Sequence, residues 1–183
     1  MTAVTDPAAK AEYPRVGVDF TAIFRAESSY VWNTLRRLGV QVRDLEDITH
    51  EVFLTVHRRL ADYDSTRPVR PWLFGIAYRT AARYRDLARH RREVFDVPAE
   101  PVDHAPGIEE QVMAQERRAL LLQALDGLDL DQRAIFVMHE IDGCPMPEVA
   151  LTLAVPLNTA YSRLRLARGH ISGALQHAKE EAR

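Results

Sequence analysis

Cysteine is nearly absent from this sequence, since Cys144 is the only one among 183 residues. A single thiol excludes an internal disulfide and a cysteine-based metal cluster, and we interpret it as a structural or incidental thiol. The chain also lacks an apolar run near the roughly 20 residues that a membrane-spanning helix needs. Residues 1–18 lack the apolar core of a signal peptide. We therefore expect residues 1–18 to be a disordered leader and the protein to be cytoplasmic, without membrane insertion.

The sequence also has little that would support catalysis or metal binding. Its seven histidines do not show metal-ligand spacing. Neither a glycine-rich phosphate loop nor the nucleophile elbow of a hydrolase is present. We therefore expect no enzymatic activity, no catalytic residues, no metal and no cofactor.

The net charge of −2 does not exclude a nucleic-acid ligand, because the charges are unevenly distributed. Residues 20–92 contain fourteen arginines against eight acids, a net charge of +6. Residues 93–110 contain six acids and no lysine or arginine, whereas residues 152–179 contain four basic residues and no acid. Two basic segments separated by an acidic one predict two surfaces that bind a polyanion. Solvated helix faces would explain one such cluster easily and two less well.

Helical periodicity dominates the chain, and no alternating strand pattern is convincing. In the first half the apolar residues predict a helix capped by Asp19 and closed by Gly39, followed by a second helix capped by Asp44. After a loop, a third helix is predicted over 71–92, with proline in its first turn. These three helices would form a compact bundle over 19–93.

Three prolines and several acids over 94–107 predict a flexible linker. Helical patterns resume over 108–125, and a further helix is expected to begin at the cap Asp129 and to end at Gly143. The remaining helices complete a second bundle over 108–183. We therefore expect an all-α protein of two small helical domains.

The end of the second bundle fits a helix-turn-helix, with a short helix over 147–153, a turn over 154–158 and a basic helix from Thr159 to about Lys179. In such a unit the second helix enters the major groove, where arginine suits guanine and hydroxyls suit phosphate oxygens. The residues expected to face the bundle are Leu157, Ala160, Leu164 and Ala167. A structural hairpin with a basic outer face is the alternative. The candidate DNA contacts are Asn158, Thr159, Tyr161, Ser162, Arg163, Arg165 and Arg168.

The third helix interleaves aromatic and basic side chains. Basic residues attract a phosphate backbone and aromatic rings stack on unpaired bases, so this helix predicts a surface for single-stranded DNA. We expect Trp72 and Phe74 to lie in the core, and Tyr78 and Tyr84 to be exposed with the arginines. An RNA-binding or merely solvated face is the alternative for the arginine-rich end.

The second helix has acids at its start and basic residues at its end. This distribution suits the helix dipole, which is a sufficient structural explanation. Exposed acids beside apolar residues would also suit a protein partner, and the residues alone leave both interpretations open.

Four segments resemble the numbered regions of bacterial sigma factors. Residues 44–60 (DLEDITHEVFLTVHRRL) resemble region 2.2, residues 71–84 (PWLFGIAYRTAARY) resemble regions 2.3 and 2.4, residues 125–136 resemble region 4.1, and the helix-turn-helix resembles region 4.2. Each motif is loose alone, but their order, together with the acidic linker, is typical of the small extracytoplasmic-function class of the sigma-70 family.

The resemblance implies a transcription initiation factor that binds core RNA polymerase and directs it to promoters through minus-10 and minus-35 elements. The acidic linker would thread towards the polymerase active-site cleft. The class usually also has an anti-sigma partner, which the sequence itself does not reveal. The second helix would dock on the clamp helices of the largest polymerase subunit through Leu45, Asp47, Ile48, Glu51 and Phe53.

The resemblance also implies that the loop over 62–70 and the third helix engage the minus-10 element in melted form. One base of the non-template strand would flip into a pocket formed by that loop, and unstacking it costs a few kcal/mol. The recognition helix would read the minus-35 element as duplex. The residues expected to hold the melted strand are Tyr63, Arg67, Arg70, Tyr78, Arg79, Thr80, Arg83 and Tyr84.

A stand-alone helix-turn-helix regulator of transcription is the alternative function. Such a protein would not need an acidic helix and an aromatic–basic helix in a separate bundle. Tight binding of promoter duplex by the free protein, without core polymerase, would favour this alternative.

Replacing Arg163 and Arg165 together with alanine is expected to weaken binding to the minus-35 element. Two lost phosphate contacts would also reduce the slope of log affinity against log salt concentration by about 2. The measurement is binding to a minus-35 duplex over a salt series. Unchanged transcription from a promoter that depends on its minus-35 element would contradict the assignment.

Overall fold

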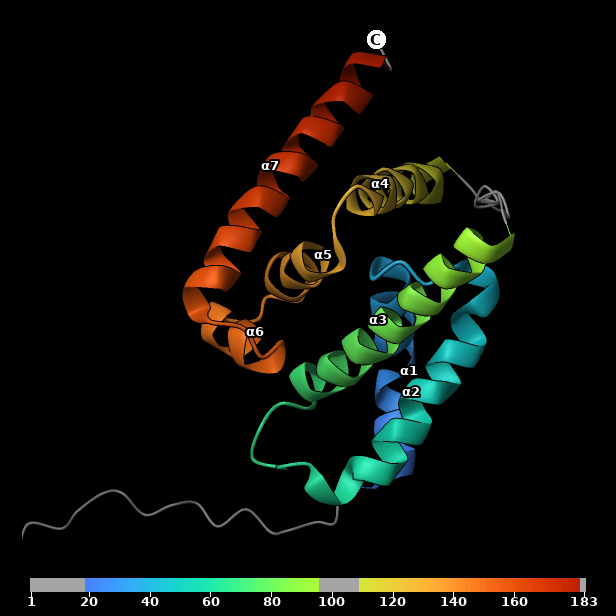
Figure 1. The fold of residues 1–183 in the computed structure, drawn as a ribbon, viewed down its shortest axis with the longest axis vertical. Helices are drawn as coiled ribbons and strands as arrows, with labels where there is room; N and C mark the ends of the chain where they lie inside the picture. Colours follow the sequence, from blue (N-terminus) through green and yellow to red (C-terminus); the bar gives the residue numbers. More distant parts are fainter. Residues whose placement is uncertain (1–18, 96–108, 182–183) are drawn as a thin grey trace, which may run out of the picture.

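The computed structural model describes residues 19–95 and 109–181, and within them every regular element is a helix (Figure 1). The all-α prediction is confirmed. The expected leader over 1–18 and most of the expected linker lie outside the described residues. None of the described helices is both long and apolar enough to cross a membrane.

The first domain consists of α1 (Phe20–Arg37), α2 (Leu45–Arg59) and α3 (Val69–Phe95), which contact one another pairwise. Their shared core is apolar and fully excluded from water. Removing such side chains from water is the main favourable contribution to folding. The core includes Val31, Leu35, Val52, Val56, Leu73, Phe74 and Ala77.

The ends of these helices agree with the predicted caps at two of three positions. Asp19 accepts a hydrogen bond from the backbone N–H of Thr21 at 3.0 Å, and Gly39 follows α1 with a φ of +93°. Asp44 precedes α2, but its side chain makes no capping hydrogen bond. Instead it accepts a hydrogen bond from the hydroxyl of Tyr84, so the predicted capping role of Asp44 was wrong.

The second domain consists of α4 (Glu109–Asp126), α5 (Leu130–Phe136) with its π-helical continuation η3 (Val137–Ile141), α6 (Met146–Thr152) and α7 (Leu157–Glu181). The predicted cap of α5 is confirmed, because Asp129 accepts a hydrogen bond from the backbone N–H of Gln132 at 2.8 Å. In the predicted helix-turn-helix, α7 begins at Leu157, two residues earlier than expected.

The two domains pack directly against each other, with α6 beside the start of α3 (Figure 1). The most deeply buried contact is Arg133 of α5, whose side chain is 2% exposed. Its guanidinium donates to the backbone carbonyls of Arg37, at the end of α1, and of Leu125. It also forms an ion pair with Asp126 at 2.8 Å. A buried charge is tolerated only with such partners, so this arginine links the two domains at a defined position.

The turn between α6 and α7 contains a strained residue. Ala154 has a φ of 55°, a left-handed conformation that costs a residue with a Cβ roughly 1–2 kcal/mol. Glycine adopts this conformation without that penalty but loses more backbone entropy on folding. The strain is therefore a local cost of closing the helix-turn-helix.

Substituting Ala154→Gly is expected to raise the free energy of unfolding, by up to about 1 kcal/mol, because the relieved strain exceeds the entropy cost. Urea denaturation followed by circular dichroism measures this change. The control is Ala150→Gly in the buried face of α6, which should destabilise the protein. A loss of stability in both variants would contradict a strained turn.

Candidate nucleic-acid interface

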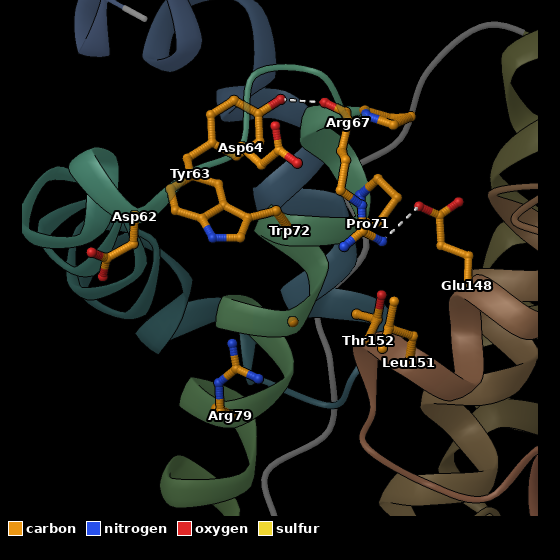
Figure 2. A pocket seen from close by; sticks show the side chains of 12 residues that line it. Asp62, Tyr63, Asp64, Arg67, Pro71, Trp72, Arg79, Glu148, Leu151 and Thr152 are labelled. Carbon is orange, nitrogen blue, oxygen red and sulfur yellow. Dashed lines mark hydrogen bonds and ion pairs between the residues drawn. The ribbon is translucent and has the colours of Figure 1, made fainter.

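A cavity of about 210 Å³ lies where the loop after α2 meets the start of α3 and the side of α6 (Figure 2). This volume is below the roughly 300–1,000 Å³ of pockets for drug-sized ligands, so the cavity has room for one small group. The second domain contributes Glu148, Leu151 and Thr152 to its wall. The first domain contributes Asp62, Tyr63, Asp64, Arg67, Pro68, Pro71, Trp72, Gly75 and Arg79.

Short-range contacts order the loop that forms one wall of this cavity. Asp64 accepts hydrogen bonds from the backbone N–H and the hydroxyl of Thr66 at 3.0 and 2.7 Å, which lowers the pKa of the Asp64 carboxyl. The Tyr63 hydroxyl donates to the carbonyl of Arg67 at 2.5 Å. The rings of Tyr63 and Trp72 lie 4.8 Å apart between centroids, at 35°. The loop therefore presents an aromatic pair in a defined orientation.

The two aromatic residues of α3 that were expected in the core are buried to different extents. Phe74 is completely buried, as predicted. Trp72 is half-buried: it packs against the core and also lines the cavity, so its assignment to the core was only partly right. The loop places the ring of Tyr63 against it.

Arg79 brings positive charge to the same cavity, one helical turn after Gly75. Burial lowers the pKa of its guanidinium, and the charge of Arg59 acts in the same direction. A side chain at Gly75 would lie 3.3 Å from both the Arg79 guanidinium and the methyl group of Thr152. The missing side chain therefore makes room for the arginine on one side and for α6 on the other.

Two tyrosines expected to be exposed are instead half-buried against carboxylates. Tyr84 donates to Asp44 at 2.6 Å, and Tyr78 donates to Asp131 of the second domain at 2.5 Å. Burial, together with these hydrogen bonds, raises the pKa of each tyrosine to about 12. The expected exposure of Tyr78 and Tyr84 was wrong, because each hydroxyl found an acceptor on another element.

The remaining candidates on α3 differ in their access to a ligand. Thr80 is 6% exposed and donates to the carbonyl of Ile76 at 3.0 Å, so its hydroxyl is not at the surface. Arg83 is exposed and forms an ion pair with Glu51 of α2. Arg70 is exposed, bonds Glu27 of α1 at 2.9 Å and lies over the ring of Tyr30 at 5.0 Å.

The candidate docking helix α2 exposes only part of the predicted set. Leu45 and Phe53 are 1% and 3% exposed and belong to the core, so the structure does not bring them to the surface. Asp47 is exposed, and Ile48 and Glu51 are half-buried. Leu54, seven residues after Asp47, is 58% exposed on the same side of the helix. This spacing of two helical turns could have identified Leu54 as a further surface residue from the sequence.

The candidate recognition helix α7 exposes most of its predicted contacts. Ala160, Leu164 and Ala167 are buried as predicted, whereas Leu157, the first residue of α7, is exposed and its predicted inward position was wrong. Thr159 is partly exposed. Arg168 is exposed and pairs with Glu140 at 2.5 Å. The exposed polar candidates are Asn158, Tyr161, Ser162 and Arg165.

Asp131 connects the two candidate DNA-binding surfaces. One of its carboxylate oxygens accepts the hydrogen bond from Tyr78, and the other pairs with Arg163 at 2.8 Å. A proposed minus-10 residue and a proposed minus-35 residue therefore share one carboxylate. No periodicity in the sequence could reveal this contact, because it joins residues of different domains.

Metal chemistry finds no support in the part of the chain that the structure describes. There, no group of three or more histidine, cysteine or acidic side chains is placed to hold an ion. Cys144 is half-buried, and burial raises the pKa of its thiol to about 11. This thiol is therefore protonated near neutral pH, in keeping with a structural role.

Two family models match the chain. The sigma-70 region 2 model matches residues 23–93, and the sigma-70 region 4 model matches residues 118–171. The first match contains the aromatic cavity residues of the first domain and the docking helix. The second contains the helix-turn-helix.

Individual sigma factors are similar over most of the chain. The RNA polymerase sigma factor NccH of Alcaligenes xylosoxydans xylosoxydans is 32% identical over 79% of this chain and 80% of its own length. CnrH of Cupriavidus metallidurans is 31% identical over 80% and 81%. The extracytoplasmic-function sigma-E factor of Escherichia coli is 27% identical over 73% and 74%.

Solved structures agree with this assignment. CnrH, in complex with the cytosolic domain of CnrY, has a TM-score of 0.62 and 25% identity, and the match covers 86% of this chain and 88% of that chain. RpoE of Bartonella quintana, in complex with the anti-sigma factor NepR, has a TM-score of 0.67, 20% identity and coverage of 86% and 97%, which supports the fold. The chain therefore belongs to the sigma-70 family of RNA polymerase sigma factors, in the extracytoplasmic-function class.

Proposed function

We propose that this chain binds core RNA polymerase through α2 and reads minus-35 DNA with α7. Melted minus-10 DNA is held at the cavity lined by the loop after α2 and the start of α3. The observation that carries the proposal is the cavity, which combines an aromatic pair with the guanidinium of Arg79. A stand-alone regulator would have no use for such a site. The chain contributes binding surfaces, and the chemistry of RNA synthesis belongs to the polymerase.

The polymerase-binding surface is the outer side of α2. Asp47 is exposed at its start, Glu51 follows one turn later, and Leu54 adds an exposed apolar side chain two turns later. An apolar centre with charged residues around it is a common composition for a protein interface. Leu45 and Phe53 support this surface from the core. Binding core polymerase also places the protein in the cytoplasm.

Replacing Asp47 and Glu51 with asparagine and glutamine is expected to lower affinity for core polymerase by about 10-fold or more while leaving the fold intact, because both are at or near the surface. Fluorescence anisotropy with labelled protein measures the affinity. In vitro transcription with core polymerase on a promoter library tests the function and reveals the promoter. The control is Glu180→Gln at the exposed end of α7. Equal binding by the double variant and the control would place the docking surface elsewhere.

The minus-10 surface is proposed to hold one flipped base between the loop and α3. The ring of Trp72 offers a stacking face, and Arg79 offers hydrogen-bond donors to a base edge or a phosphate. Arg67 lines the cavity and is exposed, and Arg70 is exposed at the start of α3. Thr80 supports the helix from inside, since its hydroxyl bonds the preceding turn.

Substituting Trp72→Ala is expected to lower the affinity of the holoenzyme for a melted minus-10 strand by about 5–150-fold, the loss of one stacked base at roughly 1–3 kcal/mol. Trp72→Phe should recover much of that affinity, because it keeps an aromatic face. The control is Trp32→Ala on α1, whose ring is 37% exposed and lies outside the cavity. Permanganate footprinting of the open complex would report the same order. An effect of Trp32→Ala equal to that of Trp72→Ala would reject the stacking role.

An anti-sigma factor is proposed as a further partner. Two structural relatives are complexes, CnrH with the cytosolic domain of CnrY and RpoE with the anti-sigma factor NepR. The exposed docking side of α2 is available to such a protein as well as to polymerase.

A further inference from the structure

Large hydrophobic side chains are concentrated on the exposed surface of the candidate recognition helix. Of the ten large hydrophobic residues that are exposed in the described part of the chain, three lie within residues 157–166 of α7. Leu157 is 41% exposed, and Tyr161 and Leu166 are each 53% exposed. Single exposed hydrophobic residues are ordinary, but a group of them on a binding surface indicates the chemistry of the partner.

The rotation of α7 about its axis is fixed by its buried side. Ala160 and Leu164 lie in the core, so Leu157 and Tyr161 cannot turn inward together with them. Leu157 and Tyr161 are four residues apart and are therefore neighbours on the helix surface. Leu166 follows Tyr161 by five residues, about 140° further around the helix, so it belongs to a different side. The exposed apolar pair is Leu157 and Tyr161.

The polar candidates near this pair are partly engaged within the protein, whereas Tyr161 is not. The hydroxyl of Ser162 donates to the carbonyl of Asn158 at 2.9 Å, and Arg168 pairs with Glu140. Four other tyrosines donate a hydroxyl hydrogen bond to an acceptor of the protein, but Tyr161 has no such partner among the described residues. Its ring and its hydroxyl are both accessible to a ligand.

Duplex DNA offers a specific complement to an apolar side chain. The base edges in the major groove carry hydrogen-bond donors and acceptors, and thymine alone adds a methyl group, at C5. The surroundings of the pair favour DNA over a protein partner, because residues 152–179 contain four basic residues and no acid. Leu157 and Tyr161 are the first and fifth residues of α7, within the part of a recognition helix that meets base edges.

We propose that Leu157 and Tyr161 are specificity-determining residues of the minus-35 contact, which select thymine through apolar contact with its 5-methyl group. This inference rests on the proposed function, since it names the base feature that α7 reads. Asn158 and Arg165, which are exposed beside the pair, supply hydrogen bonds to other base edges or to phosphates. Four residues advance about 6 Å along a helix, so the two side chains address thymines roughly two base-pair steps of 3.4 Å apart.

The test removes single methyl groups from the DNA and single side chains from the protein. The probe is the minus-35 duplex obtained from the transcription library, with each thymine replaced in turn by deoxyuridine, which lacks only the 5-methyl group. Binding of the holoenzyme, formed from core polymerase and the full chain, is measured by fluorescence anisotropy. For the wild type, deoxyuridine at the contacted positions should weaken binding by about 4-fold each, the effect of one methyl group no longer buried.

The protein variants assign each methyl contact to a side chain. Tyr161→Ala should bind thymine and deoxyuridine equally at one of these positions, and Leu157→Ala should do so at the other. Tyr161→Phe should keep the difference, because it keeps the ring. The control is Leu120→Ala on α4, which is 38% exposed outside the helix-turn-helix and should discriminate as the wild type does. A folding defect cannot produce this pattern, because the two duplexes are compared on the same protein.

Equal binding of thymine and deoxyuridine duplexes by the wild type, at every position of the element, would overturn the inference. An unchanged difference in both Tyr161→Ala and Leu157→Ala would overturn it as well, as would a minus-35 element without an A·T pair. If Tyr161→Ala instead loses affinity for core polymerase and still discriminates against deoxyuridine, the pair is a protein contact.

Failure of the proposed function has a different signature. In that case the wild-type holoenzyme would initiate from no promoter of the library, which would reject the proposed function and this inference together. Initiation from a minus-35-dependent promoter without discrimination against deoxyuridine would reject the inference alone.

Discussion

Burial of the Arg133 guanidinium is the constraint on which the arrangement of the two domains depends. An ionised group removed from water must recover hydrogen bonds elsewhere, and this one does so at the carbonyl that ends α1, at the end of α4 and at Asp126. The C-terminal end of a helix carries partial negative charge, so both carbonyls suit a cation. Burial lowers the pKa of this guanidinium, and the hydrogen bond and charge of Asp126 oppose that effect. Of its hydrogen bonds, the one to the Arg37 carbonyl crosses from the second domain to the first.

Several other contacts between the domains are also polar. Tyrosine hydroxyls and arginines of the first domain meet aspartates and a glutamate of the second, mostly at part-exposed positions. Exposed ion pairs contribute little to stability, a median of about 0–1 kcal/mol each. The core of each domain, in contrast, is apolar and fully buried. Buried apolar residues of both domains belong to one cluster, so the interface has an apolar part beside its polar contacts.

Local features of the fold were predictable from the sequence, because they depend on neighbouring residues. The caps at Asp19 and Asp129, the turn at Gly39 and the buried side of α7 follow from spacing and side-chain chemistry alone. Asp44 has the residue type and position of a cap, yet its carboxylate bonds Tyr84, forty residues later in the chain. Competition between a local and a distant partner cannot be resolved from periodicity.

For the candidate site, the sequence likewise predicted residue types but not the contacts between distant residues. Residue types in the loop and on α3 indicated DNA binding, but they did not indicate that Trp72 lies at the edge of the core against Tyr63. They also did not indicate that Tyr78 is occupied by Asp131. Both facts depend on which elements come together in three dimensions.

Acids of the second domain contact donors that the sequence assigns to DNA: Asp131 contacts Tyr78 and Arg163, and Glu148 contacts Arg67. A hydroxyl or guanidinium that recognises phosphate will also recognise a carboxylate, so an acid placed on the neighbouring domain becomes a competitor for DNA. The competitor is effective only while the domains are in contact, because its advantage is its high local concentration. The domains are also joined by apolar contacts, since buried residues of both belong to one hydrophobic cluster, so these shared polar groups are only part of what holds the domains together.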